Sequence, residues 1–569
     1  MKYFLLALSL LAITHLIAQE EKSKGNLNIG IESNMQYRLF DQEDNSIEED
    51  NFGSNNYINI NYDINKFSFG IQIEGYAPIA IENFSPSYNK QIGLATAFAK
   101  YKTKKIEATL GNFYEQFGSG LTLRSWEDRQ LGINNALLGA RVKYNITDGV
   151  ELIALAARQR YGFELSESNI YGFDSKINLG EMFKYEKTGL NIGLSFVGKD
   201  EPYISVTPGF QGEEFPNYVY STSARIGFTQ KGFYTDAEYV YKSNDVRIKT
   251  GEVHEGYKFD GNAMLLTLGY SKKGMGISTT LRRLENMKFY SERQADGNLY
   301  NEQIMNYIPG LTKQHDYSLT NIYVYQAQSG TDFSELSKGD DNKIKGKVKD
   351  GEMGGQIDFY YKFKKKSTLG GKYGTKIAVN YSQWSDLYTT LKQEGQESIY
   401  DTNYTTDFWN YRNLYYRDFN FEVRKKWSKK LSSIFSYINL YYNKTKLEGA
   451  EYKDVEANIF VAESTYKLGK GRAIRAEAQH LWTNDDQKNW MAGTLEYNAS
   501  SKLSFFLTDM YNYGSTDDHY YNFGSSYTKN KTRIALNYGK QRSGLLCVGG
   551  VCRVVQASTG FNLNIVTSF

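Results

Sequence analysis

The chain of 569 residues contains 48 tyrosines and 32 phenylalanines, yet its mean hydropathy is −0.56. This length exceeds one ordinary globular core, and the near balance of 67 basic against 64 acidic residues argues against a concentrated basic face for nucleic acid. Aromatic residues interleaved with polar ones are instead typical of a transmembrane β-barrel, whose strands face lipid on one side and water on the other.

Residues 1–18 have the pattern of a secretory signal peptide. Lys2 supplies a positive charge, an apolar run follows, and Ala18 is a small residue before a polar stretch. The alternative, a membrane anchor, is disfavoured because an apolar run of about 15 residues is short for a spanning helix. We therefore expect cleavage after Ala18 and export to the outer membrane. Residues 19–569 then form a single barrel domain, because no later apolar run suits a helix and only a closed barrel spans a membrane without helices.

Apolar and polar residues alternate in short segments from Gly25 onward. A period of two indicates β-strands, since successive side chains leave opposite faces of the pleat. The clearest segments are residues 58–62, 67–73, 192–196, 224–228, 534–538 and 561–569. The last of them ends on Phe569, as is usual for an outer-membrane barrel.

The connections between these segments are alternately short and long. The short, polar ones are residues 63–66, 102–105, 146–149, 186–189, 230–232, 271–274, 364–370, 427–430, 468–471, 499–502 and 528–532. The long ones are residues 41–55, 198–217, 244–257, 287–314, 391–406, 445–452 and 512–519. Short periplasmic turns and long extracellular loops alternate in this way in outer-membrane barrels. Eleven hairpins and one strand at each end predict an all-β, antiparallel barrel of about 24 strands, with 22 or 26 as alternatives.

The segment at residues 111–144 interrupts the alternation. It begins and ends as strands, but its middle combines glycine-rich turns with a group of charged and aromatic side chains: Arg124, Trp126, Glu127, Asp128 and Arg129. Such charge density suits a loop folded into the lumen, where it would pair with the wall and narrow the pore. We predict a constriction here. A structural salt-bridge latch and an ordinary extracellular loop are the alternatives.

Several arginines elsewhere occupy the polar phase of predicted strands: Arg141, Arg225, Arg282, Arg475 and Arg533. An arginine that faces lipid near the midplane costs roughly 2–4 kcal/mol, so these side chains are expected to face the lumen. A wall rich in arginine would favour anions or acidic solutes.

Three later segments depart from simple strands. Residues 301–317 contain Pro309 and are expected to form another inward or capping loop. Residues 317–328 resemble a strand that the count of 24 does not place. Residues 332–350 are charged and low in apolar content, which indicates a mobile insertion.

Cys547 and Cys552 lie in the sequence Cys-Val-Gly-Gly-Val-Cys. In an exported protein this pair is expected to form a disulfide across a tight hairpin. Two thiolates without a nearby histidine or third cysteine would be an incomplete metal site.

Catalytic and cofactor-binding motifs are not found in the chain. It has neither a His-Glu-x-x-His metal motif nor a Gly-x-Ser-x-Gly nucleophile turn. We therefore expect no enzymatic activity, no cofactor and no metal.

Three stretches resemble a known family: residues 111–142, 304–319 and 543–561. Together with the signal peptide that ends in Ala-Gln, the strands rich in Tyr, Asn and Lys, and the terminal Phe, they resemble an outer-membrane barrel family of the Bacteroidota known only as a domain of unknown function. The resemblance extends over essentially the whole mature chain. It implies the fold and the location, but no substrate and no functional residues.

The sequence thus predicts an outer-membrane barrel whose lumen is partly filled by inward loops. The expected function is passage or binding of small hydrophilic solutes in a porin-like channel, with outer-membrane lipid around it. The alternative is a non-transport subunit or scaffold of an envelope secretion or outer-membrane biogenesis assembly, with partners that the sequence does not identify. Strand alternation begins soon after the cleavage site, which argues against a separate N-terminal plug domain.

Overall fold

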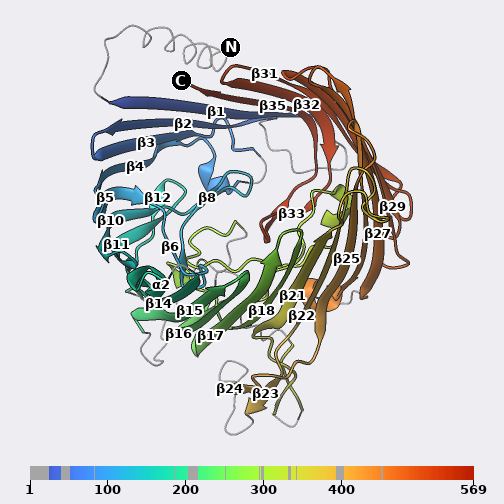
Figure 1. Cartoon of the computed structure of the whole chain (residues 1–569). Coiled ribbons are helices and arrows are strands. Elements are labelled where there is room, and N and C mark those ends of the chain that lie inside the picture. The colour runs from blue at the N-terminus through green and yellow to red at the C-terminus, as the bar shows by residue number, and fades with distance from the viewer. Residues whose placement is uncertain are drawn as a thin grey trace.

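The computed structural model describes residues 25–39, 51–81, 84–185, 187–202, 216–249, 252–293, 295, 300–330, 335–340, 343–392, 403–449 and 453–569. These residues form a closed antiparallel barrel of 24 strands (Figure 1). The strands of the wall are β1 (Asn26–Arg38), β2 (Phe52–Ile64), β3 (Phe67–Gly75), β4 (Ile92–Lys102), β5 (Ile106–Phe113), β10 (Leu137–Thr147), β11 (Val150–Tyr161), β13 (Asn169–Asn178), β14 (Thr188–Asp200), β15 (Tyr218–Gln230), β16 (Phe233–Lys249), β17 (Glu252–Lys272), β18 (Met275–Glu285), β21 (Gly351–Lys362), β22 (Thr375–Ser385), β25 (Leu414–Lys426), β26 (Leu431–Tyr442), β27 (Val455–Gly469), β28 (Arg472–Trp482), β29 (Trp490–Asn498), β30 (Leu503–Asn512), β31 (Asp518–Lys529), β32 (Thr532–Gln541) and β35 (Ser558–Ser568).

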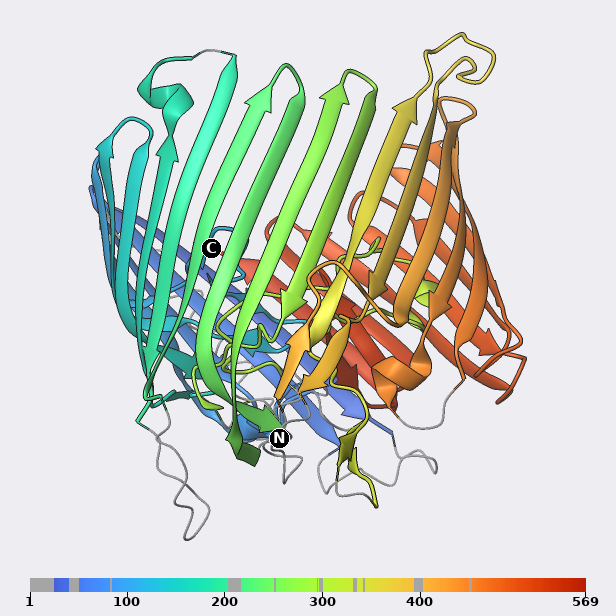
Figure 2. The same ribbon diagram turned by 90° about the horizontal axis from the view of Figure 1, so that it is seen from below.

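The barrel is closed by its first and last strands. β1 pairs antiparallel with β2 on one side and with β35 on the other, so the sheet has no free edge. The eleven predicted short connections join consecutive strands at one end of the barrel, called here the short-turn rim, and the longer connections lie at the opposite, long-loop rim (Figure 2). The predicted count of 24 strands is confirmed.

The outer face of the wall is apolar. On β15, Ile226 is 54 % exposed, whereas the adjacent Arg225 faces the lumen, and Leu110 and Leu507 are similarly exposed on β5 and β30. Aromatic side chains such as Trp427 are exposed at the short-turn rim. This pattern of an apolar band with aromatic edges matches a bilayer as the surrounding solvent. In the part of the chain that the structure describes, no helix is both long and apolar enough to cross a membrane.

The remaining elements are short and belong to the connections. They are η1 (Pro86–Tyr88), β6 (Gln116–Phe117), β7 (Leu123–Arg124), β8 (Glu127–Asp128), β9 (Ile133–Asn134), β12 (Glu164–Leu165), α2 (Leu179–Met182), η3 (Ser318–Asn321), β19 (Ser337–Lys338), β20 (Ile344–Lys345), β23 (Thr389–Lys392), β24 (Asn403–Thr406), α3 (Lys444–Glu448), β33 (Gly544–Val548) and β34 (Val551–Val555).

Among the connections that enter the barrel, three contact one another. We name them the first inward loop (residues 114–136, with β6–β9), the second inward loop (residues 286–330, with η3) and the disulfide hairpin (residues 542–557, with β33 and β34). Figure 1 shows β6, β8 and β33 inside the ring of wall strands. Apolar side chains bury these loops: Phe117 packs in one cluster with Ile153 of β11, and Leu319 in another with Ile459 of β27. The predicted partial filling of the lumen is therefore confirmed.

Some predicted segment boundaries were wrong. Residues 244–257 are not a long loop, because β16 continues to Lys249, β17 begins at Glu252, and the two strands pair up to these ends. Residues 317–328 do not form a spanning strand. They contain η3 and lie in the second inward loop, where their aromatic side chains are buried by the wall instead of facing lipid.

The predicted insertion at residues 332–350 contains a small packed hairpin. β19 pairs with β20, and Leu336, Ile344 and Val348 form a buried cluster with Leu391 and Tyr404 packed against it. Three apolar residues are enough to hold this hairpin, because they pack against the β23–β24 connection and do not have to form a separate core.

Several predicted features lie outside the described residues. They include the signal peptide at residues 1–18 and parts of six predicted long loops, at residues 41–50, 203–215, 250–251, 294 with 296–299, 393–402 and 450–452. Four connections at the long-loop rim, at residues 76–91, 162–168, 483–489 and 542–557, were not among the predicted long loops.

Candidate functional site

The three inward segments contact one another through the backbone. Arg124 donates its backbone N–H to the carbonyl of Met305 at 2.8 Å, which joins the first inward loop to the second. Gly310 donates its N–H to the carbonyl of Gly550 at 2.7 Å, which joins the second loop to the disulfide hairpin. The lumen is therefore occupied by one connected body, built from segments far apart in the sequence.

Glu74 on β3 is the main anchor of the first inward loop. Its carboxylate lies 2.7 Å from the guanidinium of Arg160 on β11, and both side chains are at most 3 % exposed. It also accepts hydrogen bonds from Asn134 of β9, from Gln72 and from Tyr76, at 3.0–3.1 Å. A buried ion pair with these extra hydrogen bonds holds the loop to two strands that are not neighbours in the sheet.

Sequence reasoning did not find this pair. Glu74 and Arg160 are 86 residues apart. The polar phase of each strand would have placed both side chains inward, but no local pattern indicates that they meet.

Arg124 and Trp126 lie at the contact between the two inward loops, where they pack against Tyr307. The Arg124 guanidinium lies 3.7 Å from the ring centre of Tyr307 and 4.9 Å from that of Trp126. The two rings meet edge to face at 5.6 Å. Among the described residues no carboxylate pairs with Arg124, so cation–π contacts hold this side chain.

Arg129 ties the first inward loop to the wall. Its guanidinium lies 2.6 Å from Glu32 of β1 and 2.8 Å from Glu127, and it covers the ring of Tyr57 on β2 at 4.1 Å. Asp128 accepts hydrogen bonds from backbone N–H groups two and three residues further on, so it caps a turn. These contacts join the first inward loop to β1 and β2 inside the lumen.

Three of the five predicted wall arginines, all on the N-terminal half of the wall, pair with carboxylates. Arg141 lies 2.6 Å from Glu107, Arg225 lies 2.5 Å from Asp174, and Arg282 lies 2.6 Å from Glu352. Each pair neutralises the positive charge where it arises.

The other two predicted wall arginines lie on the C-terminal half of the wall. Arg475 is surrounded by three carboxylates, two of which, Glu463 and Glu496, lie 3.0 and 2.9 Å away. Arg533 is exposed and donates to Asn564 at 3.2 Å. The arginine content of the wall therefore does not translate into a surplus of positive charge at these positions.

The second inward loop has a buried ionic anchor of its own. The guanidinium of Arg293 is fully buried, 2.8 Å from Asp245 of β16. Lys199 of β14 lies 2.8 Å from Glu201 and 3.5 Å from Asp245. This network holds the start of the loop against β14 and β16, the two strands that flank β15.

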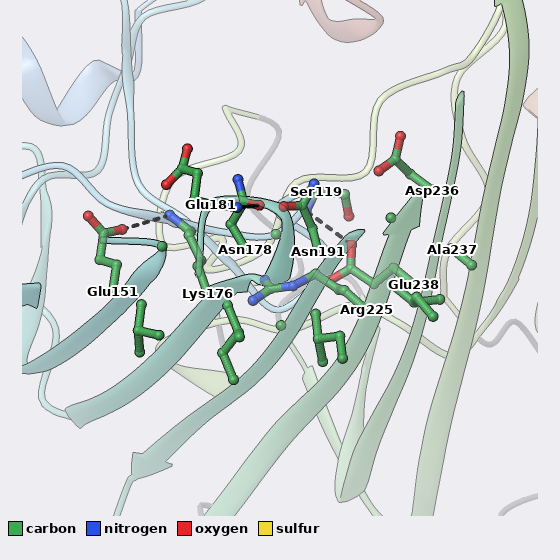
Figure 3. A pocket seen from close by; sticks show the side chains of 18 of the residues that line it. Ser119, Glu151, Lys176, Asn178, Glu181, Asn191, Arg225, Asp236, Ala237 and Glu238 are labelled. Atoms are coloured by element: carbon green, nitrogen blue, oxygen red, sulfur yellow. Dashed lines mark hydrogen bonds and ion pairs between the residues drawn. The ribbon is translucent and has the colours of Figure 1, made fainter. Parts of the chain in front are cut away.

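A cavity of about 650 Å³ lies in the lumen between the wall and the tip of the first inward loop (Figure 3). Ser119 at this tip donates its backbone N–H to Glu238 of β16 at 3.0 Å. The charged side chains that line the cavity are Glu151, Lys176, Glu181, Arg225, Asp236 and Glu238. Four carboxylates against two cations make the charge of the lining acidic on balance. The lining continues to Gly149 and Asn178, so the cavity extends toward the short-turn rim.

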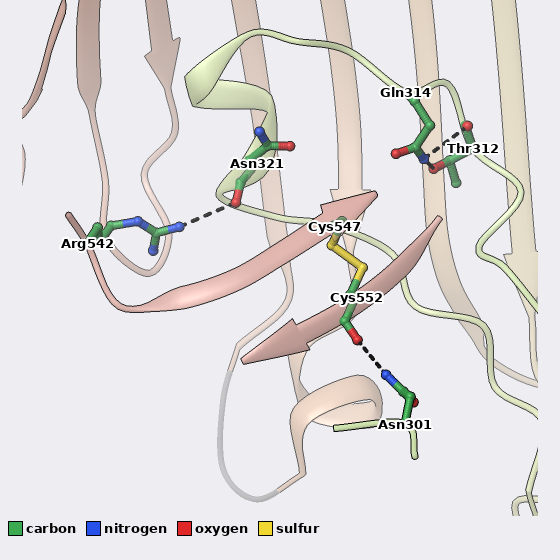
Figure 4. The surroundings of a disulfide bond; sticks show 7 residues. All are labelled: Asn301, Thr312, Gln314, Asn321, Arg542, Cys547 and Cys552. Carbon is green, nitrogen blue, oxygen red and sulfur yellow. Dashed lines mark hydrogen bonds between the residues drawn. A yellow bond between two sulfur atoms is a disulfide. The ribbon is translucent and has the colours of Figure 1, made fainter. Parts of the chain in front are cut away.

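The disulfide predicted between Cys547 and Cys552 is present and joins β33 to β34 (Figure 4). Asn301 of the second inward loop donates to the carbonyl of Cys552 at 3.1 Å. The buried guanidinium of Arg553 donates to the carbonyl of Leu131 in the first inward loop, and burial lowers its pKa to about 10. The hairpin therefore contacts both inward loops.

The match that identifies the family covers the whole chain. The profile of a family of unknown function (DUF6029) matches residues 1–569. The chain belongs to this family. A search of curated proteins finds no match to it.

Three solved structures that this chain resembles are distant from it in sequence. The P pilus usher (PapC) translocation pore has 9 % identity and a TM-score of 0.38, covering 95 % of this chain and 99 % of that one. A mutant ferric enterobactin receptor (PfeA) from Pseudomonas aeruginosa has 9 % identity and a TM-score of 0.41, covering 96 % and 81 %. A BenF-like porin from Pseudomonas fluorescens Pf-5 has 8 % identity and a TM-score of 0.35, covering 86 % and 98 %. Likenesses at this level carry no argument about what this chain binds or transports.

The carboxyl of Asp350 makes one junction of the long-loop rim sensitive to pH. Thr406 Oγ1 of β24 lies 2.8 Å from a carboxyl oxygen of Asp350 and 2.8 Å from one of Glu285. Burial, with the neighbouring charge of Glu285, raises the pKa of Asp350 to about 7. A carboxyl whose pKa is raised on folding binds its proton more tightly in the folded state. Its stabilisation is therefore complete at low pH and is lost as the pH rises through about 7.

We expect hydrogen exchange at residues 403–406, corrected for intrinsic rates, to be slower near about pH 5 than near about pH 8. The substitution Asp350→Asn should abolish this difference, because the amide keeps a polar contact with Thr406 but does not titrate. A pH dependence that persists unchanged in Asp350→Asn would contradict the assignment.

Proposed function

We propose that the protein is an outer-membrane channel for small hydrophilic solutes, held closed in this conformation by its inward loops. The observation that carries the proposal is the cavity of about 650 Å³ beneath Ser119, which is lined by six charged side chains and has the size of a small-molecule site. The loop above it is tied to the wall by ion pairs and hydrogen bonds, which can open without breaking a covalent bond.

The preference for anions expected from the arginines is not part of this proposal. Arg141, Arg225, Arg282 and Arg475 lie in ion pairs, and the cavity lining carries more carboxylates than cations. Export through a signal peptide at residues 1–18 and an origin in the Bacteroidota stay predictions from the sequence. No catalytic step is proposed.

One observation favours a second function, a scaffold or subunit of an envelope assembly. The second inward loop packs against the wall like a protein core, with Leu319, Trp384 and Trp490 almost fully buried. A lumen filled in this way would suit a barrel that never opens.

Planar-bilayer recordings of the purified barrel test the two functions. We expect the wild type to open rarely and Arg129→Ser to open more often, because the variant loses the ion pairs to Glu32 and Glu127. Charged hydrogen bonds of this kind contribute about 1–3 kcal/mol. Arg424→Ser is the matched control, since Arg424 is exposed and its ion pair with Glu422 lies on β25 and does not include the first inward loop.

The control variant should record like the wild type. A barrel that stays silent in all three forms would overturn the channel proposal and leave the scaffold.

A further inference from the structure

The connection between β22 and β25 carries a group of exposed aromatic side chains, called here the aromatic lip. Its members are Tyr388, Phe408, Trp409 and Tyr411, which are 44 %, 37 %, 71 % and 55 % exposed. A contiguous patch of large exposed aromatic side chains on a folded protein marks a surface that contacts something other than water.

The lip lies on the outside of the barrel. Arg282 faces the lumen, where it donates to the carbonyl of Pro309 in the second inward loop. The next residue, Arg283, therefore faces outward, and its guanidinium lies 4.6 Å from the ring centre of Phe408. Both views show the β23–β24 hairpin of the same connection on the outer surface of the wall (Figures 1 and 2).

The lip begins where the lipid-facing band of the wall ends. Leu281 on β18 is 41 % exposed on the outer face, whereas Arg283 is 3 % exposed beneath the lip. Two residues along a strand span about 6–7 Å. The ring of Phe408, which lies over Arg283, is therefore next to the end of the apolar band at Leu281.

The backbone of the lip is held in place. Asp407 accepts hydrogen bonds from the N–H groups of Trp409 and Asn410, and donates its own N–H to the carbonyl of Tyr388 at 2.9 Å. The guanidinium of Arg412 lies 5.0 Å from the ring centre of Tyr388. The exposed rings are thus presented by a fixed turn.

We infer that the aromatic lip is immersed in the head-group region of the outer leaflet and anchors the outward hairpin to the lipid. Trp and Tyr rings favour this region because one edge is apolar and the other can form hydrogen bonds with water and head groups. The lip is continuous with the lipid-facing wall, so lipid extends over both without a break. The inference rests on the proposed outer-membrane location but not on channel activity.

Spin-label accessibility in the full-length barrel tests this inference. A nitroxide is attached to Trp409→Cys, and separately to Tyr411→Cys, which retains Trp409. The barrels are reconstituted into vesicles of phosphatidylethanolamine and phosphatidylglycerol. Leu281→Cys serves as the lipid-facing control. Asn484→Cys, exposed in the β28–β29 connection at the same rim, serves as the water-facing control.

We expect both lip labels to be relaxed by oxygen and protected from a water-soluble nickel complex, as the label at Leu281→Cys is. Labels as accessible to nickel as that at Asn484→Cys would overturn the inference. Labels shielded from both reagents would also overturn it, because a protein surface, from a second copy or a partner, would then cover the lip. Conductance is not used, so failure of the channel proposal does not affect this result.

Discussion

Replacing Glu74 with glutamine is expected to release the first inward loop and to give the largest rise in conductance of any single substitution in the lumen. The variant leaves the guanidinium of Arg160 buried without its carboxylate. Loss of one partner of a buried pair costs about 3–5 kcal/mol. The carboxylate also accepts from Asn134, Gln72 and Tyr76, so the loop loses its anchor on β3 as well. Single-channel recording, together with hydrogen exchange at residues 127–134, measures the effect.

Glu496→Gln is the control for this substitution. Glu496 pairs with Arg475, but it is 40 % exposed and Arg475 keeps two other carboxylates. Its loss should cost at most about 1 kcal/mol and leave conductance unchanged. Wild-type exchange and conductance in Glu74→Gln would show that the loop is held elsewhere.

Replacing Glu352 with glutamine is expected to free the second inward loop. Glu352 is fully buried and lies 2.6 Å from Arg282. Its other oxygen accepts from the hydroxyl of Tyr325 at 2.5 Å and from the backbone N–H of Gln328 at 2.6 Å. The substitution should lower the stability of this loop by about 3–5 kcal/mol, for the same reason as at Glu74. Tryptic cleavage after Lys313, which lies within the loop, should then accelerate by orders of magnitude.

Glu335→Gln provides the comparison for Glu352→Gln. Glu335 pairs with Lys446 in a partly exposed contact, so the cleavage rate should stay close to that of the wild type. Equal cleavage rates in both variants would mean that the Glu352 contacts do not hold the loop.

The strands of the wall were predictable from the sequence because the environment of each side chain, lipid or water, selects an apolar or a polar residue at that position. Lipid on one face and water on the other impose a period of two, which identified the strands and the turns. The same rule failed where a strand leaves the bilayer. β16 and β17 continue to Lys249 and from Glu252 in water, where no apolar face is needed.

The segments inside the lumen were predictable only where they interrupt the alternation of apolar and polar residues. The break in alternation at residues 111–144 located the first inward loop, and the charges there located Arg129. The partners could not be read from the sequence, because Arg129 and Glu32 are 97 residues apart and meet only when the loop between β5 and β10 folds inward and reaches β1. Tyr325 resembled a lipid-facing strand residue because burial in the lumen selects the same side chains as burial in lipid.

The contacts among the three lumen segments have a consequence for how the barrel would open. The hydrogen bonds from Arg124 to Met305, from Gly310 to Gly550 and from Arg553 to Leu131 form a closed circuit. Moving any one segment breaks contacts with both of the others, so the energies of the three displacements are not independent. A gate built in this way is cooperative. Its current traces should show two levels, shut and fully open, without the sublevels that three separate gates would produce.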